Sequence, residues 1–207
     1  MTPLDPKPAQ TMAAAVLAIE KEIAFPPACI TFAQAVLESG RFHSSLFTQA
    51  NNPYGIKREN VAWGEFDVAT REVVTTATLA KWRAQGIEII SASPRPDGLV
   101  DAIIKAKFQR FPNLVEATRQ HALLFRLPWY LRCQAAYSVY GWRGVARTLG
   151  PVIDSQTGKP YPPGSAQFVP SYSTDPDYGR VLTDVIMEYR LDDAAVLQSY
   201  AEKGTAA

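Results

Sequence analysis

The sequence predicts a mixed α+β protein in which a mainly helical lobe is joined to a small β-rich lobe. The first and last thirds of the chain repeat apolar residues at helical spacing, whereas the middle third alternates and is rich in β-branched and aromatic residues. Hydrophobic residues make up 47% and charged residues 20% of the 207 residues, so a core can form without disulfides. This length suits one large domain, or one domain with an insertion.

The first helix is expected over residues 10–24, where Val16 and Ile23 belong to one apolar face. Residues 1–9 contain three prolines and are expected to form an irregular arm. Pro26 and the proline after it end the helix, because proline removes a backbone donor.

The second helix is expected over residues 28–39 and is almost entirely apolar, which predicts a central, buried position. Pro27 suits its first turn. Glu38 and Ser39 are its first polar residues after Gln34, and Gly40 can provide a left-handed C-cap.

The middle third is expected to form the β-rich lobe after a short helix and a turn. Its elements are a helix capped by Ser44 or Ser45, a turn at 51–53, a hairpin at 61–74, a helix at 75–85 ended by Gly86, and strands at 87–91 and 102–111.

The last third returns to helix. Its elements are a helix over 114–126 capped by Asn113, a largely helical stretch at 129–149, a loop with five prolines at 150–170, and a last helix over 177–189. Residues 10–197 are therefore expected to form one domain, and the polar residues 198–207 a frayed tail.

The charge balance excludes some functions. A net charge of +1 gives no case for nucleic acid as a partner. Two histidines and two cysteines without ligand spacing give no case for zinc, and no metal or organic cofactor is expected. Cys29 and Cys133 are expected to be buried, although the sequence leaves a disulfide open. The first ten residues lack the basic region and apolar run of a secretory signal peptide, so none is expected, and no apolar segment is long enough to cross a bilayer.

Glu38 is the main candidate for chemistry. Burial raises the pKa of a carboxyl group, so an acid at the end of an apolar helix tends to stay protonated near neutral pH. A protonated carboxyl group is what glycosidic bond cleavage needs at the leaving oxygen. The alternative from helix position alone is a solvated glutamate at a helix end.

Five motifs in order resemble the glucosaminidase family of peptidoglycan hydrolases (glycoside hydrolase family 73), which includes flagellar-rod and autolysin enzymes. They are F-A-Q-A-V-L-E-S-G at 32–40, Q-A-N-N-P-Y-G-I-K at 49–57, A-K-F-Q-R-F at 106–111, the 114–124 helix with H-A-L-L, and S-Y-S-T-D-P-D-Y at 171–178. Together they span roughly residues 28–190. The chain departs from the family pattern by a longer segment at 139–168, which could line a cleft, dock a partner or decorate the surface.

The resemblance implies a lysozyme-like fold with a substrate cleft between the two lobes. It implies that Glu38 is the general acid, that Glu72 on the β lobe is the second carboxylate, and that Tyr172 lies near the acid and the bound sugar. Glu65 is the alternative to Glu72. A retaining, an inverting and a substrate-assisted mechanism all remain open.

Several polar and aromatic residues could contact the sugar. The expected substrate-binding residues are Asn51, Asn52, Tyr54, Trp63 and Trp142, although at least one of the two asparagines is expected to stabilise the turn. His121 is expected to be structural.

The expected function is hydrolysis of the β-1,4 bond after N-acetylglucosamine in peptidoglycan, as an endo-β-N-acetylglucosaminidase. One alternative is an N-acetylmuramidase or lytic transglycosylase on the same fold. Another is a non-catalytic module that binds the cell wall. The expected partner is the glycan strand, acted on by a monomer in the periplasm or outside the cell. A phage endolysin, a secretion-system hydrolase and a housekeeping bacteriolytic enzyme all fit.

Overall fold

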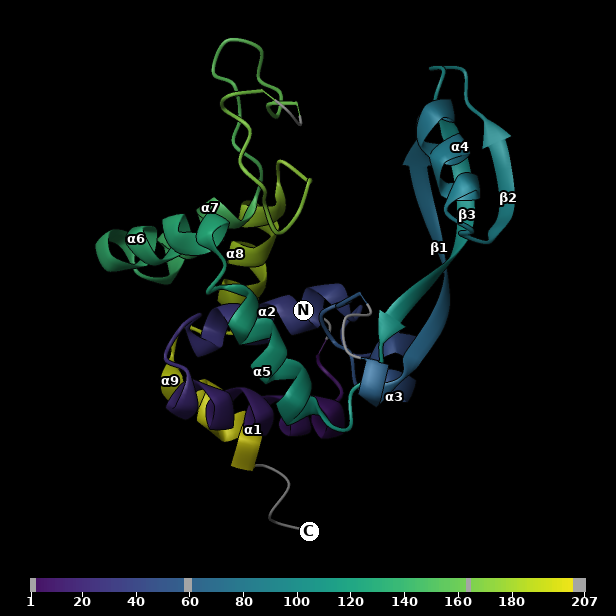
Figure 1. Ribbon diagram of the computed structural model, residues 1–207. Coiled ribbons are helices and arrows are strands. Elements are labelled where there is room, and N and C mark those ends of the chain that lie inside the picture. Colours follow the sequence, from purple (N-terminus) through teal and green to yellow (C-terminus); the bar gives the residue numbers. More distant parts are fainter. Residues whose placement is uncertain (1–2, 58–60, 163–164, 203–207) are drawn as a thin grey trace.

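The computed structural model describes residues 3–57, 61–162 and 165–202. Its elements separate into two lobes (Figure 1). The helical lobe contains α1 (Pro6–Glu22), α2 (Ala28–Glu38), α3 (Ser45–Ala50), η1 (Val61–Trp63), α5 (Leu114–Leu124), η2 (Pro128–Tyr130), α6 (Leu131–Tyr140), α7 (Trp142–Leu149), α8 (Tyr178–Glu188) and α9 (Ala194–Glu202). The β lobe, residues 65–109, contains β1 (Glu65–Val74), α4 (Thr76–Ala84), β2 (Ile89–Pro94) and β3 (Val100–Gln109). The predicted α+β class is confirmed.

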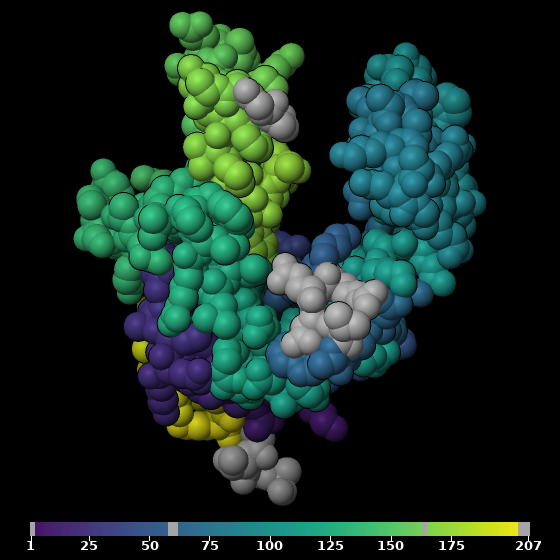
Figure 2. Space-filling model, viewed as in Figure 1, coloured from purple at the N-terminus to yellow at the C-terminus, as the bar shows by residue number. Residues whose placement is uncertain are grey.

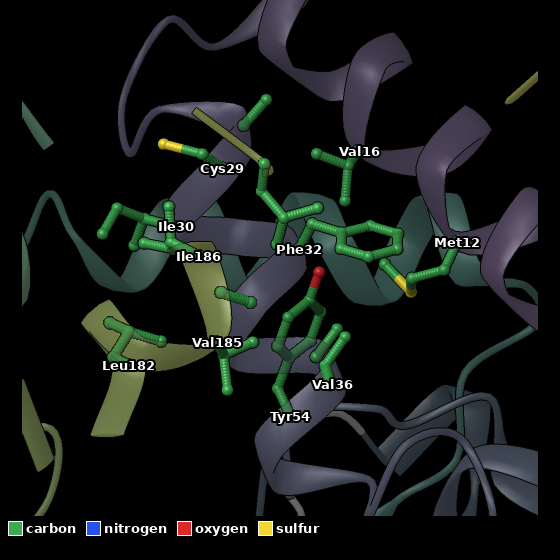
Figure 3. Packing of buried hydrophobic residues seen from close by; sticks show 14 of the residues in the cluster. Met12, Val16, Cys29, Ile30, Phe32, Val36, Tyr54, Leu182, Val185 and Ile186 are labelled. Carbon is green, nitrogen blue, oxygen red and sulfur yellow. The ribbon is translucent and has the colours of Figure 1, made fainter. Parts of the chain in front are cut away.

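Helix α2 lies at the centre of the helical lobe, as its apolar sequence predicted. Every residue from Ala28 to Val36 is buried, and α2 packs against α1, α7 and α8. Figure 3 shows Phe32 of α2 next to Met12 of α1, with side chains of α8 close by. A helix buried on all sides is held in place by its neighbours, so its last residue has a defined position.

The two ends of the chain are more ordered than the sequence suggested. Helix α1 begins at Pro6, so residues 6–9 are helical and the expected irregular arm is wrong there. Proline fits the first helical turn, and the Asp5 carboxylate accepts a hydrogen bond from the backbone N–H of Lys7 at 3.2 Å.

A further helix, α9, follows α8 and extends to Glu202, so the predicted fraying of residues 198–202 is also wrong. The reason is tertiary: α9 packs along α1, and Tyr200 stacks on Phe32 with ring centroids 5.8 Å apart. Residues 1–2 and 203–207 of these two expectations lie outside the described residues.

The β lobe is a three-stranded antiparallel sheet in the order β1-β3-β2, with α4 packed on one face. The predicted hairpin within 61–74 is wrong. Residues 65–74 form one continuous strand that pairs with β3, from Glu65 opposite Gln109 to Val74 opposite Val100. An alternating sequence indicates a strand but does not name its partner. The predicted helix after Thr75 and the two later strands are confirmed.

The long segment at 139–168 divides into two parts. Helix α7 belongs to the helical core, because Val145, Ala146 and Leu149 are fully buried. Beyond Gly150 the chain leaves the lobe as a proline-rich arm, described for residues 151–162 and 165–170, which stands opposite the β lobe (Figure 2). None of its described residues lines the hollow that contains Glu38.

Both cysteines are buried, which confirms the expectation from the sequence, and they do not form a disulfide with each other. Burial raises the pKa of the Cys29 thiol to about 12, so it stays protonated. Within the described ranges, no helix has the length and apolar character that a membrane crossing requires.

Candidate active site

A tight turn ends α2 directly after Glu38. Ser39 is buried, and its hydroxyl donates to the carbonyl of Ala35 at 2.5 Å and accepts from the N–H of Phe42 at 2.8 Å. Gly40, Arg41 and Phe42 all have positive φ angles, of 57°, 57° and 71°. Such backbone is costly for residues with a side chain, so the Ser39 bonds are needed to hold it. The turn therefore fixes where the helix stops and where Glu38 stands.

Among the described residues, the Glu38 carboxyl group has one hydrogen-bond partner, and that partner comes from far along the chain. The hydroxyl of Tyr178, the first residue of α8, donates to Glu38 Oε1 at 2.8 Å. The side-chain amide of Gln34, one turn earlier on α2, donates to the same hydroxyl at 3.2 Å. The three side chains form a line from the buried core to the acid, which restrains the carboxyl group from one side.

The pKa of Glu38 is raised above its ordinary value. The main cause is desolvation, and the hydrogen bond from Tyr178 opposes it because it favours the ionised form. The side chain is nevertheless exposed, because it lines an open hollow at the end of α2. A carboxyl group with these properties can hold a proton and deliver it to a bound molecule.

The Glu38 hollow has a volume of about 520 Å³. Its lining combines the acid with aromatic and aliphatic side chains from both lobes, namely Glu38, Leu46, Tyr54, Gly55, Ile56, Lys57, Phe108, Leu124, Tyr130, Tyr172 and Ser173. This composition suits a sugar, whose rings have apolar faces and polar edges.

Tyr172 lines the same hollow as Glu38, so the structure brings these two predicted site residues together. Its backbone N–H donates to the carbonyl of Leu149 at 3.0 Å, which ties it to the end of α7. Its ring lies 5.7 Å from that of Tyr178. Burial raises the pKa of Tyr172 well above its ordinary value, so its hydroxyl remains a hydrogen-bond donor.

His121 supports the floor of the hollow from beneath. It is fully buried, and it stacks on Tyr54 with ring centroids 3.9 Å apart and contacts Tyr172 edge-on at 5.8 Å. Burial lowers the pKa of His121 to about 3, so the ring is neutral. The expectation of a structural histidine fits these contacts.

The two asparagines hold the backbone. Asn52 is 1% exposed, and its side chain donates to the carbonyls of Ile56 and Gln109 and accepts from the N–H of Ile56. Asn51 donates to the carbonyl of Phe111 at 3.1 Å. Both therefore stabilise the turn and its link to β3. Asn52 is too buried to contact a sugar.

The predicted aromatic contacts separate into two groups. Tyr54 lines the Glu38 hollow, but its hydroxyl is bonded to Thr118 at 3.2 Å. Trp63 packs on Phe111, and Trp142 lies under the guanidinium of Arg143. Neither tryptophan is among the residues that line the hollow.

Glu72 lies outside the Glu38 hollow. Glu72 is opposite Ala102 on β3. Phe108, which lines the hollow, is six residues further along the same strand. At about 3.3 Å per residue this is roughly 20 Å along the strand. Glu65, the alternative, is at the base of β1 and is bound by Lys107 at 2.6 Å.

Two residues of the site had no role in the sequence interpretation. Tyr178 closes the last of the five motifs, and Gln34 belongs to the first, so both were visible as motif positions. Their hydrogen bonds span 140 and 144 residues, which only the fold reveals.

Comparisons with known proteins place the chain in a family. A family model described as glucosaminidase, mannosyl-glycoprotein endo-beta-N-acetylglucosaminidase, matches residues 13–191. A curated relative, the exo-glucosaminidase LytG of Bacillus subtilis (strain 168), is 25% identical over 164 residues, which is 79% of this chain. The chain spans 44% of the length of that relative.

Solved structures share the fold. The catalytic domain of the autolysin Auto from Listeria monocytogenes has a TM-score of 0.56 at 17% identity, covering 97% of this chain and 89% of that one. A glycoside hydrolase domain of FlgJ from Salmonella typhimurium has a TM-score of 0.53 at 20% identity, covering 90% and 99%. A peptidoglycan hydrolase mutant from Sphingomonas sp. A1 has a TM-score of 0.52 at 20% identity, covering 95% and 97%.

Proposed function

Because the chain belongs to the glucosaminidase family, we propose that it hydrolyses the glycan strands of peptidoglycan at the β-1,4 bond after N-acetylglucosamine. The observation that carries this proposal is the Glu38 carboxyl group, which has a raised pKa and lies on the floor of a sugar-sized hollow beside Tyr172. This site provides a proton donor where a glycosidic oxygen can be placed.

The hydrogen bond from Tyr178 assigns different tasks to the two carboxyl oxygens. Oε1 accepts the bond, so the proton resides on Oε2. In the reaction Oε2 donates this proton to the leaving oxygen as the glycosidic bond breaks, and positive charge develops on the sugar ring. The ionised Glu38 that results is stabilised by the Tyr178 hydroxyl. Tyr172 donates to the sugar bound above Glu38.

A second group must assist at the anomeric carbon. Glu72 is the proposed second carboxylate by resemblance, but two cooperating carboxylates lie about 5–10 Å apart, well below the roughly 20 Å strand offset between Glu72 and the hollow. The observed arrangement of the lobes therefore favours assistance by the 2-acetamido group of the sugar. Its carbonyl oxygen bonds to the anomeric carbon as the leaving oxygen departs, and water, which gives a proton back to the ionised Glu38, then replaces that bond. Glu72 could act only if the β lobe closed onto the substrate.

The test is digestion of purified peptidoglycan followed by mass analysis of the reducing ends. We expect N-acetylglucosamine at the new reducing ends and a loss of at least about 1000-fold in rate for Glu38→Gln, because the amide carries no transferable proton. Glu188→Gln is the matched control, since Glu188 also ends a helix. Muramic acid at the new ends, or lysis by Glu38→Gln at the rate of the unmodified protein, would contradict the proposal.

Glu72→Gln in the same assay separates the two routes. Acetamido assistance predicts that this variant keeps more than about a tenth of the rate. A loss as deep as that of Glu38→Gln would instead identify Glu72 as the second carboxylate and require the β lobe to close.

The proposed setting follows from the substrate. The protein acts on the bacterial cell wall, in the periplasm or outside the cell, and we propose that it works as a monomer. Sedimentation of the active protein tests the oligomeric state.

A further inference from the structure

The β lobe has a groove of its own. This β-lobe groove has a volume of about 680 Å³ and is lined by Lys57, Asp67, Glu72, Trp82, Gln85, Gly86, Ile87, Glu88, Ile104, Lys105, Ala106 and Lys107. Lys57 also lines the Glu38 hollow, so the two depressions meet at this side chain. A molecule bound over Glu38 can therefore extend a branch past Lys57 into the β lobe.

The lysines of the groove differ in their partners. Lys105 is paired with Asp67 at 3.1 Å, and Lys107 with Glu65 at 2.6 Å. Lys57 has no carboxylate partner among residues 3–57, 61–162 and 165–202. An exposed ammonium without a counter-ion, at the junction of two depressions, is available for an anionic group of a ligand.

Lys57 is nevertheless held in position. Its ammonium nitrogen lies 4.0 Å from the ring centroid of Phe108, and its backbone forms an isolated bridge with the same residue. The Phe108 side chain is buried in the small core of the β lobe. A cation held over an aromatic ring keeps its charge at a defined point, so less freedom is lost when it binds an anion.

The rest of the groove suits a short peptide. Trp82, Ile87 and Ile104 provide apolar surface, Lys105 is paired with Asp67, and the Glu72 carboxylate can accept hydrogen bonds from peptide N–H groups. Peptidoglycan is a branched polymer: its glycan strand carries short peptides, and those peptides contain free carboxylates. The glycan alone between peptide branches has N-acetyl and hydroxyl groups without charge.

We propose that the β-lobe groove binds the stem peptide of peptidoglycan and that Lys57 binds a carboxylate of this peptide. This inference rests on the proposed function, since it takes the glycan to lie over Glu38. It makes Lys57 a specificity-determining residue, which favours strands that carry peptides over bare strands. Nothing in the proton transfer from Glu38 requires Lys57, because desolvation raises the pKa of the acid and the opposing hydrogen bond comes from Tyr178.

The experiment compares kcat/KM on two soluble substrates. One is a preparation of un-cross-linked glycan strands with their peptides. The other is the same preparation after an amidase has removed the peptides and the lactyl carboxylates that this hydrolysis releases on the glycan have been converted to amides. For Lys57→Gln we expect a loss of about tenfold on the peptide-bearing strands and of less than about threefold on the bare strands. Lys57→Arg should restore most of the preference. Lys81→Gln removes an equal charge from α4 of the β lobe, outside the groove, and should match the unmodified protein on both substrates.

A third substrate tests the carboxylate itself. Peptide-bearing strands whose carboxylates have been converted to amides should be cut about tenfold more slowly by the unmodified protein, with no further loss for Lys57→Gln. The difference between the proteins on untreated strands should also shrink at high salt.

Two outcomes would overturn the inference while leaving the proposed function intact. Equal losses for Lys57→Gln on both strand preparations would place Lys57 in a glycan subsite. A full effect of Lys57→Gln on the amidated strands would exclude carboxylate binding. Failure of the unmodified protein to cut either preparation would instead contradict the proposed function. A thermal unfolding midpoint for Lys57→Gln within about 2 °C of the unmodified protein confirms that the variant is folded.

Discussion

At the scale of single residues, the site depends on a phenol that comes from the other end of the domain. Tyr178 opens α8 and Glu38 closes α2, so the bond between them joins the ends of two helices that pack together. Its effect on the acid is opposite to that of burial, because a donated hydrogen bond favours the ionised carboxylate. The pKa of Glu38 is thus a balance of two structural features that can be altered separately.

Removing the Tyr178 hydroxyl should move the pH profile of the enzyme. A general acid works while it is protonated, so activity falls as the pH rises through the pKa of Glu38. In Tyr178→Phe the ionised form loses its donor, the pKa of Glu38 rises further, and the alkaline limb of kcat/KM should shift to higher pH. The rate at the optimum should fall by about tenfold, because the carboxyl group is less well held.

The measurement is kcat/KM against pH on soluble strands. Tyr140→Phe is a suitable control, since Tyr140 is 64% exposed on α6. A shift of the alkaline limb to lower pH in Tyr178→Phe would show that the Tyr178 hydroxyl does not stabilise the carboxylate.

The sequence pointed to Glu38 and Tyr172 but not to the residues behind them. Glu38 and Tyr172 stand in motifs that resemble a known family, and the fold places both in one hollow. Asn52 also stands in one of these motifs, yet its side-chain amide donates its hydrogen bonds to backbone carbonyls. A motif marks a position as important without telling whether the side chain faces a ligand or its own backbone.

At the scale of elements, the position of α8 is set by one close approach. A Cβ atom added to Gly179 would lie 2.6 Å from the carbonyl oxygen of Ala146, so α8 crosses α7 with their backbones nearly in contact. Gly179 follows Tyr178 directly. The distance between the helices therefore also determines whether the Tyr178 hydroxyl can reach Glu38.

Gly179→Ala should displace the start of α8. Backbone atoms cannot yield as a flexible side chain would, so we expect a loss of about 1–3 kcal/mol in the free energy of unfolding. We also expect activity to fall together with the hydrogen bond to Glu38. Urea unfolding and kcat/KM are the measurements.

Gly150→Ala provides the comparison, because a Cβ atom there would have its nearest neighbour at an ordinary 3.5 Å. Equal stability of the two variants would show that α7 and α8 can separate without cost.

Local sequence patterns predicted most helices but misassigned strand pairing. Apolar periodicity and caps such as Asn113 and Thr75 are local signals, and the helices that they predicted are present. The partner of β1 is β3, whose last residue is 44 positions from the start of β1, and such pairing has no local signal. Helix α9 was missed for the same reason, since its stability comes from packing on α1.

At the scale of the whole molecule, the two lobes have separate cores. The core of the β lobe consists of Leu79 with five side chains of β3, and the large core belongs to the helical lobe. A small core buries little apolar surface, so the β lobe should open more readily than the helices around α2. This matters for function, because the β-lobe groove and Lys57 are on the less stable side of the cleft.

Leu79→Ala should loosen the β lobe alone. Leu79 is 5% exposed, and its truncation should cost about 2–4 kcal/mol of local stability. Hydrogen exchange should quicken throughout β1, β2 and β3 and remain unchanged in α2 and α8. Faster exchange in α2 to the same degree would show that the lobes unfold as one unit.

The buried, unpaired cysteines have a practical consequence for experiments on this cleft. Burial keeps the thiols of Cys29 and Cys133 protonated and shielded from solvent, so thiol reagents will react with both slowly in the folded protein. A new cysteine on the exposed rim of each wall would then take a fluorescent dye or a spin label without prior removal of the native ones. Pairs of such labels would report the width of the cleft in solution, molecule by molecule, as substrate enters and leaves.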